Sequence, residues 1–206
     1  QQTLKQLADE DVVYCGTIKD SPRFEWRGLM LDEARHFFGK EQVKKVLDLM
    51  ARYKMNRFHW HLADNQGWRV EIKAYPQLAA VGGVGCLSNR KAPARVYTQD
   101  EIREIVAYAA ERHIEVIPEI DLPGHSLAFN KVFPEFDAGH RTVNPAKEGL
   151  YEVLETIMTE LADLFPGRYI HIGGDEVETD GWRARADIPP FMKREGIKSY
   201  DDIQKY

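Results

Sequence analysis

The chain contains little cysteine and no long apolar run. Its 206 residues include only two cysteines, Cys15 and Cys86, which lie far apart in the sequence. Such a pair makes neither a disulfide framework nor the closely spaced cysteines of a zinc site, so the redox compartment stays undetermined. No apolar stretch approaches the roughly 20 residues of a membrane-spanning helix. These absences argue against a disulfide-stapled small domain and against a membrane protein.

An excess of basic residues is also missing. The chain has 28 lysine and arginine residues against 33 aspartate and glutamate residues, which gives a net charge of −5. A protein that binds nucleic acid through its phosphates normally carries a positive excess, so we expect no nucleic-acid partner. Hydrophobic residues make up 43% and charged residues 30%, a balance that is typical of a globular protein and argues against a disordered chain.

The first residues of the chain are polar and mixed in charge. They have neither the basic start nor the apolar centre of a signal peptide, and residue 1 is glutamine. We therefore expect that a signal peptide was removed or that the chain starts inside a longer protein. Residues 1–20 are predicted to be a lead-in or the end of a preceding domain, and residues 199–206 resemble the start of a helix.

Strand-like and helix-like segments alternate along the rest of the chain. Each predicted helix carries apolar residues at helical spacing, and Thr98 with Glu101 forms the pattern of a capping box. Strands are predicted over residues 24–31, 56–62, 114–120 and 169–172, and helices over 41–54, 98–112, 148–164 and from about Pro189 or Pro190. This alternation predicts parallel strands that are joined by crossover helices.

Four strand–helix units make up half of a (β/α)8 barrel, which usually needs ~250 residues or more. A four-stranded flavodoxin-like sheet is the alternative. That fold should show a glycine-rich phosphate loop after the first strand, and residues 32–36 (DEARH) do not form one. We therefore predict an α/β fold of the TIM-barrel type, in which residues 21–206 supply about the first four units of a (β/α)8 catalytic barrel.

Polar side chains follow the end of each predicted strand. They are Asp32, Arg35 and His36 after the first strand, Asp64, Asn65 and Trp68 after the second, Asp121 and His125 after the third, and Asp175 and Glu176 after the fourth. One such cluster would be weak support for a site, because these residue types are common in turns and at helix N-termini. The carboxyl ends of barrel strands meet at the face that holds the active site, so four clusters predict one active site.

The strongest local signal is the segment 171–176, with the sequence HIGGDE. Its two glycines permit a sharp turn at the strand end, so that Asp175 and Glu176 could face one cleft although they are adjacent. Two close carboxyl groups cannot both ionise freely, and one pKa should therefore rise, as a general acid at neutral pH requires. The alternative is a surface turn with two solvated acids.

Other candidates have a structural alternative as well. Arg35 could recognise a polar or anionic group with its planar set of donors, or it could form a surface salt bridge. Trp68 could form the wall of a sugar site or pack under the loop. Asp121 and His125 could act together on one tight turn, or they could be a helix N-cap and a structural histidine.

His59 and His61 lie two residues apart on one predicted strand, so their side chains point the same way. Metal-dependent hydrolases on the same barrel show this pattern, but a metal site would need further histidines at later strand ends. The alternative is one or two buried histidines with backbone partners. We expect no metal and no cofactor, and a metal-dependent hydrolase that uses His59 and His61 stays an alternative hypothesis.

Four motifs together resemble the catalytic domain of family 20 glycoside hydrolases, the β-N-acetylhexosaminidases. They are RGLMLD with RHF (27–37), HWHLADNQGWR (59–69), PEIDLPGH (118–125) and HIGGDE (171–176). The family's fold is a (β/α)8 barrel, in agreement with the alternation of elements. The resemblance implies exo-hydrolysis of terminal N-acetylglucosamine or N-acetylgalactosamine from glycans.

The resemblance also implies roles for the candidates. Glu176 matches the general acid/base, and Asp175 matches the carboxylate that orients the 2-acetamido group of the substrate. In this family the acetamido oxygen is the nucleophile, and the configuration at the anomeric carbon is retained.

Four further residues match supporting groups of the family. Arg35 matches the arginine that binds the 3- and 4-hydroxyls of the terminal sugar. Asp64 and His125 match residues that tune and position the acid, and Asp121 matches a supporting acid.

Relatives supply further pocket walls from later strands. We therefore expect this chain to need the remainder of the same polypeptide, or self-association, to close the barrel, and we expect the isolated chain to be inactive. The implied partners are N-acetylhexosamine-terminated glycans, and a secreted, periplasmic or lysosomal location is favoured over the cytoplasm. A non-catalytic carbohydrate-binding relative is the other alternative, against which the intact Asp175 and Glu176 argue.

Overall fold

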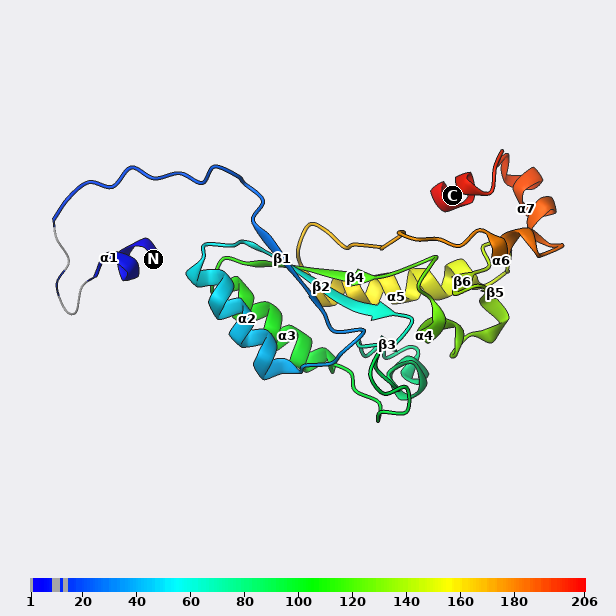
Figure 1. Ribbon diagram of the computed structural model, residues 1–206, viewed down its shortest axis with the longest axis horizontal. Helices are drawn as coiled ribbons and strands as arrows, with labels where there is room; N and C mark the ends of the chain where they lie inside the picture. The colour runs from blue at the N-terminus through cyan, green and yellow to red at the C-terminus, as the bar shows by residue number, and fades with distance from the viewer. Residues whose placement is uncertain (1, 9–11, 13–14) are drawn as a thin grey trace.

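Residues 15–23 run away from the sheet (Figure 1), whereas the Gln6 side chain near the N-terminus donates a hydrogen bond to the Arg52 carbonyl at 3.0 Å. The structure, a computed structural model, describes residues 2–8, 12 and 15–206. A short helix, α1 (Gln2–Leu7), precedes an extended stretch over residues 15–27 that leads into the sheet. Residues 1, 9–11, 13 and 14 of the predicted lead-in lie outside the described residues.

Parallel strands form the centre of the fold, as the alternation of elements predicts. The sheet contains β1 (Gly28–Asp32), β2 (Arg57–Asp64), the short β3 (Gly67–Trp68) and β4 (Glu115–Ile120). β2 pairs in parallel with both β1 and β4, whereas β3 turns back antiparallel to the end of β2. The register places Asp32, His61 and Glu119 side by side across three strands.

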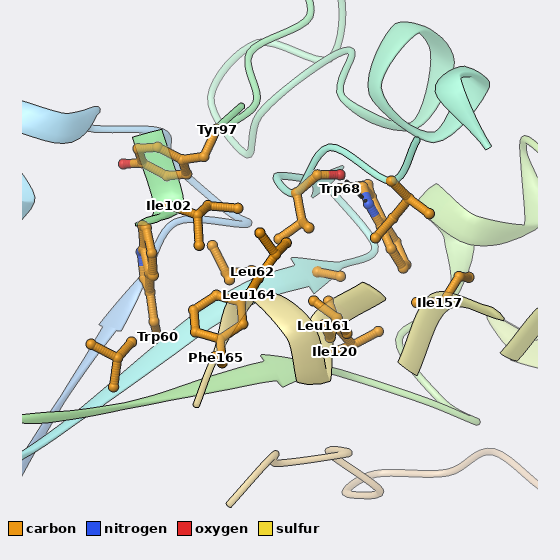
Figure 2. Close-up of a cluster of buried hydrophobic side chains, with 14 of the residues drawn as sticks. Trp60, Leu62, Trp68, Tyr97, Ile102, Ile120, Ile157, Leu161, Leu164 and Phe165 are labelled. Carbon is orange, nitrogen blue, oxygen red and sulfur yellow. Dashed lines mark hydrogen bonds between the residues drawn. The ribbon is translucent and has the colours of Figure 1, made fainter. Parts of the chain in front are cut away.

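Helices cover one face of this sheet. They are α2 (Lys40–Arg52), which follows β1, α3 (Gln99–Ala110), which precedes β4, and α5 (Leu150–Leu164). Figure 2 shows Trp60 and Leu62 of β2 within the core, together with Ile102 of α3 and Leu161 of α5. Because side chains alternate along a strand, His59 and His61 of β2 lie on the opposite face.

The predicted capping box at the start of α3 is confirmed. The Thr98 hydroxyl accepts a hydrogen bond from the Glu101 N–H (3.2 Å), and the Glu101 carboxylate accepts one from the Thr98 N–H (3.1 Å). These two bonds satisfy backbone donors that have no partner within the helix, which explains why α3 begins at this point.

Two predicted strands differ from the observed ones. The first strand begins at Gly28 rather than at residue 24, because the Arg27 N–H donates to the Asn56 side chain and the Phe24 carbonyl accepts from the Arg27 guanidinium. The strand predicted over 169–172 is reduced to a single bridge between His171 and Glu119. Beyond it the chain turns away at Gly173, which has a positive φ of 71°.

Smaller elements complete the described part of the chain. Within residues 199–206, where the sequence predicts the start of a helix, Asp201–Lys205 form a 3-10 helix, and the helix predicted near Pro189 begins at Ile188. No helix among the described residues has both the length and the apolar character needed to cross a bilayer. The smaller elements are the π-helical turn η1 (Leu78–Gly82), α4 (Leu127–Asn130), η2 (Pro134–Phe136), β5 (Asp137–Gly139), β6 (Thr142–Val143), α6 (Asp180–Arg183), α7 (Ile188–Glu195) and η3 (Asp201–Lys205).

Candidate active site

The polar residues that follow the strands meet at one edge of the sheet, as predicted. The Arg35 guanidinium lies 2.7 Å from the Asp64 carboxylate, whose other oxygen lies 3.2 Å from Nδ1 of His125. Nε2 of His125 in turn lies 3.4 Å from the Glu176 carboxylate. Four residues, at the ends of β1, β2 and β4 and after the bridge at His171, are therefore joined in one continuous chain of polar contacts.

Asp64 is the centre of this arrangement. Its side chain is fully buried, and it binds Arg35, His61, His125 and the N–H of Asn65. Burial on its own would raise the pKa of Asp64, but the hydrogen bonds from His61 and the Asn65 N–H and the charge of Arg35 hold this pKa below its ordinary value. Asp64 is therefore a fixed carboxylate that orients its neighbours.

Arg35 binds two carboxylates, of which the one on Asp64 is buried. Its guanidinium bonds to Asp32 as well as to Asp64, each at 2.7 Å, and 35% of its side chain is exposed. The Asp32 carboxylate also accepts from the Arg35 N–H at 2.9 Å. The planar donors of Arg35 are thus held in one orientation beside solvent, where they can meet the hydroxyls of a ligand.

His125 connects the buried carboxylate to the exposed acid. Its Nδ1 lies 3.2 Å from the Asp64 carboxylate and also 3.2 Å from the side-chain amide nitrogen of Asn65. Its buried Nε2 faces the Glu176 carboxyl group at 3.4 Å and has no hydrogen-bond partner among the described residues. The ring therefore lies beside Glu176 at a distance longer than that of a normal hydrogen bond.

The predicted turn at residues 171–176 is present. Gly173 and Gly174 both have positive φ values, of 71° and 94°. Asp175 and Glu176 are exposed, and 78% of the Glu176 side chain is accessible. Exposure of both acids agrees with the alternative of a solvated turn, so a raised pKa within this pair stays a prediction.

Asp121 is the carboxyl group in this region whose pKa is raised. Burial raises the pKa of Asp121 to about 6, against the hydrogen bond from the Gly174 N–H and the charge of His125, and the nearby Asp175 adds to the rise. The Gly174 N–H lies 3.1 Å from the Asp121 carboxylate. The sequence predicts a raised carboxyl pKa for Asp175 or Glu176, and the structure shows one for Asp121.

Replacing Asp121 with asparagine is expected to stabilise the protein above about pH 6. In the folded wild type the Asp121 carboxyl ionises near pH 6, whereas in the unfolded chain it ionises near 3.8, so stability is lost as the pH rises between these values. The asparagine variant keeps an acceptor for the Gly174 N–H and avoids this loss, on the order of 3 kcal/mol at pH 7. Urea denaturation at pH 4 and pH 7 measures it. A variant that is less stable than wild type at both pH values would contradict the assignment.

Gly173 lets the turn pass close to Asp121. A Cβ atom at this position would lie 1.9 Å from the Asp121 carboxylate and 2.7 Å from its Cα atom. We expect Gly173→Ala to lose more than the ~1–2 kcal/mol of a left-handed non-glycine residue, because the backbone must also move. Gly139→Ala is the matched control, since Gly139 has a positive φ of 82° and nothing within 4 Å of its added Cβ. Equal losses in urea denaturation would show that Asp121 does not restrict the turn.

Two candidates from the sequence do not join this site. Trp68 is 1% exposed, donates to the Val70 carbonyl and packs on Phe129, so its interpretation as a pocket wall is wrong and it lies under the loop instead. His36 contacts the Ser88 hydroxyl at 3.2 Å. Asn65, by contrast, reaches Nδ1 of His125 at 3.2 Å.

The histidines of β2 bind a carboxylate rather than the backbone partners that the sequence suggested. One oxygen of Glu119 lies 2.5 Å from His59 and 2.6 Å from His61, which confirms that the two rings point the same way. His59, Glu119 and His171 have possible ligand atoms within 4.8 Å of one another, a donor set of a kind that zinc binds. His61 instead groups with Asp64, so the pair on which the metal hypothesis was based does not form one cluster.

Sequence reasoning missed several buried polar residues that support the site. Arg69 is 1% exposed, and its guanidinium donates to five carbonyls, those of Glu33, Ala34, Gly83, Gly85 and Arg95. These bonds hold the loop after β3 against the segment that carries Arg35. Glu119 could have been found, because a glutamate within the apolar run of residues 114–120 needs a buried partner.

Comparisons with known proteins agree with this geometry. Residues 24–206 match glycosyl hydrolase family 20, catalytic domain. A β-hexosaminidase of Porphyromonas gingivalis is 41% identical over 202 residues, which cover 92% of this chain and 26% of that protein. The crystal structure of a GH20 exo-β-N-acetylglucosaminidase from Vibrio harveyi in complex with N-acetylglucosamine superposes with a TM-score of 0.88 at 40% identity, over 98% of this chain and 36% of the other.

A β-N-acetylhexosaminidase from Bacteroides fragilis gives a TM-score of 0.90 at 34% identity, over 99% of this chain and 43% of that one. The chain therefore spans less than half the length of each of these relatives. The match extends through all four motifs and through the strand ends that carry them. This chain belongs to glycosyl hydrolase family 20, and its strand–helix units are those of a TIM-barrel-type catalytic domain.

Proposed function

We propose that this chain carries the catalytic residues of a β-N-acetylhexosaminidase, which removes terminal N-acetylglucosamine or N-acetylgalactosamine from glycans. The observation that supports this most directly is the contact chain from Arg35 through Asp64 and His125 to Glu176. It joins a group suited to binding sugar hydroxyls with a group suited to proton transfer, within a family 20 domain.

In the first step, the acetamido oxygen of the substrate attacks the anomeric carbon while the bond to the leaving oxygen breaks. Glu176 gives its proton to that oxygen, and Asp175 orients the acetamido group and favours the positive charge that develops on it. In the second step Glu176 takes a proton from water, which attacks the anomeric carbon and opens the oxazolinium-type ring. Two inversions give net retention.

Three residues act around this pair. Arg35 binds the 3- and 4-hydroxyls of the terminal sugar, which fixes the ring against the reacting groups. Asp64 holds both Arg35 and His125, and Asp121 supports the segment that carries Asp175 through its bond to the Gly174 N–H.

We further propose that residues 21–206 are the N-terminal part of a (β/α)8 barrel, with residues 1–20 as a lead-in. The sheet face that carries the histidines also exposes an apolar side chain, because Met30, the register partner of His59, is 51% exposed. Exposed apolar surface of this kind fits a face that further strands cover, from the same polypeptide or from a second copy. Side chains on those strands would complete the walls of the pocket that binds the glycan.

Hydrolysis of 4-nitrophenyl N-acetyl-β-D-glucosaminide and galactosaminide by the complete protein tests this function. We expect turnover of at least one of these two substrates, and much slower turnover of the 4-nitrophenyl glucoside that lacks the acetamido group. Binding of N-acetylglucosamine without turnover would favour a non-catalytic carbohydrate-binding protein.

A chelator is expected to leave that rate unchanged, because the proposed steps use carboxyl, histidine and arginine side chains alone. The measurement compares the rate before and after dialysis against EDTA, followed by added zinc. Loss of activity that zinc restores would favour the metal-dependent hydrolase.

A further inference from the structure

His61 lies between two buried carboxylates. Its Nδ1 is 2.6 Å from the Glu119 carboxylate and its Nε2 is 3.0 Å from the Asp64 carboxylate. The side chains of His61, Glu119 and Asp64 are 5%, 6% and 0% exposed, so both contacts are buried. His61 thus connects Glu119 on β4 directly to Asp64 at the centre of the candidate active site.

The two contacts determine the charge of the ring. An ionised carboxylate only accepts hydrogen bonds, so a ring with a carboxylate at each nitrogen needs an N–H on both, and such a ring is an imidazolium cation. Burial on its own would lower the pKa of His61, but the hydrogen bonds to Asp64 and Glu119 outweigh it and raise this pKa to about 10. Correspondingly, burial of Glu119 is outweighed by hydrogen bonds from His59 and His61, and its pKa is lowered.

The two oxygens of the Asp64 carboxylate contact different parts of the site. Oδ2 accepts from His61 and from Arg35, whereas Oδ1 faces His125. A rotation of this carboxylate would move Arg35 and His125 together. An interaction that fixes Asp64 therefore also fixes Arg35, which is proposed to bind the sugar, and His125, which faces Glu176.

We propose that His61, held as a cation by Glu119, is a positioning residue that locks the Asp64 carboxylate, so that Arg35 is aimed at the substrate and His125 at Glu176. The effect on turnover depends on the proposed function, but the cationic bridge itself does not. Glu119 acts as the anchor behind His61, and His59 and His171 share that anchor at 2.5 and 3.2 Å without contacting Asp64 by any hydrogen bond or ion pair within the described residues.

The pH dependence of this bridge reflects every charged group that faces it. Asp64 faces His61 on its own strand, Arg35 after β1 and His125 after β4. The groups that face or lie near His61 are Asp64 on β2, Glu119 on β4, Asp121 after β4, and Asp32 on β1. Removing the cation leaves Asp64 with one fewer positive neighbour, and its pKa should rise.

The first test is the protonation state of His61 in the wild-type protein, from nitrogen-15 NMR of the imidazole rings. We expect both ring nitrogens of His61 to show imidazolium shifts that do not change between pH 5 and pH 9. A neutral ring with one bare nitrogen in this range would overturn the proposal. This readout needs no substrate, so it stands even if the protein were not a hexosaminidase.

The second test is the pH profile of kcat/KM for His61→Gln. We expect a loss of about 10- to 100-fold, because small displacements of positioned groups have effects of this size, and an acid limb that moves to higher pH. His59→Gln is the matched control: it removes a similar contact with Glu119 but none with Asp64, so its acid limb should not move.

Equal losses in the two variants with unmoved acid limbs would show that His61 is only part of the scaffold. If His61→Gln does not fold, Glu119→Gln replaces it, since this isosteric change removes the anion that anchors the cation. In that variant the His61 ring should titrate between pH 5 and pH 9, and a ring that stays fully charged would contradict the role of Glu119.

Discussion

Replacing Glu176 with glutamine is expected to lower kcat by about 10²- to 10⁴-fold on substrates with a poor leaving group, such as an N-acetylglucosamine disaccharide. Glutamine keeps the shape of the side chain at the turn but has no proton to give. A nitrophenyl leaving group needs little protonation, so kcat for a nitrophenyl substrate should fall much less. The measurement is kcat for both substrates in the complete protein.

Glu178→Gln is the matched control for this variant. Glu178 lies two residues further along the same segment, pairs with Arg141, and has no contact with His125 within the described residues. Its removal should leave both rates close to wild type. Equal losses on the two leaving groups for Glu176→Gln would contradict the general acid role.

Replacing Asp175 with asparagine is expected to lower kcat on N-acetylated substrates by about 10²- to 10³-fold, with little change in KM. In the proposed mechanism the carboxylate interacts most strongly with the acetamido group when positive charge develops on it, so its loss should affect the transition state more than the bound substrate. Initial rates over a range of substrate concentrations separate the two parameters. A raised KM with unchanged kcat would assign Asp175 to binding alone.

The sequence predicts the parts of the fold that depend on local patterns. β2 and β4 follow from short apolar runs, and α3 begins directly after its N-cap Thr98 because the two residues of the capping box lie only three positions apart. The strand predicted around residue 170 fails because it pairs with β4 at only one position before Gly173 turns the chain. Hydrophobic runs indicate a strand but do not tell how many partners it finds.

The candidate site could likewise be predicted only in part. Positions after the strands predict where Arg35, Asp64 and His125 meet, since parallel strands bring their carboxyl ends together. The place of Glu119 in an apolar run indicates that it has a buried partner. Which residues it contacts, and the burial of Asp121, could not be predicted, because they depend on the register between strands about 60 residues apart. A single tryptophan, Trp68, likewise gives no local sign of whether it faces a ligand or the core.

The proposed function requires that the substrate's own acetamido oxygen is the nucleophile, with Asp175 and Glu176 as its partners. The most direct measurement is kcat for a series of nitrophenyl glucosaminides whose acetyl group carries none, one, two or three fluorine atoms. Fluorine withdraws electrons from the carbonyl oxygen and weakens it as a nucleophile. Substrate assistance predicts that kcat falls steeply with each fluorine, whereas a rate that does not depend on fluorination would contradict it.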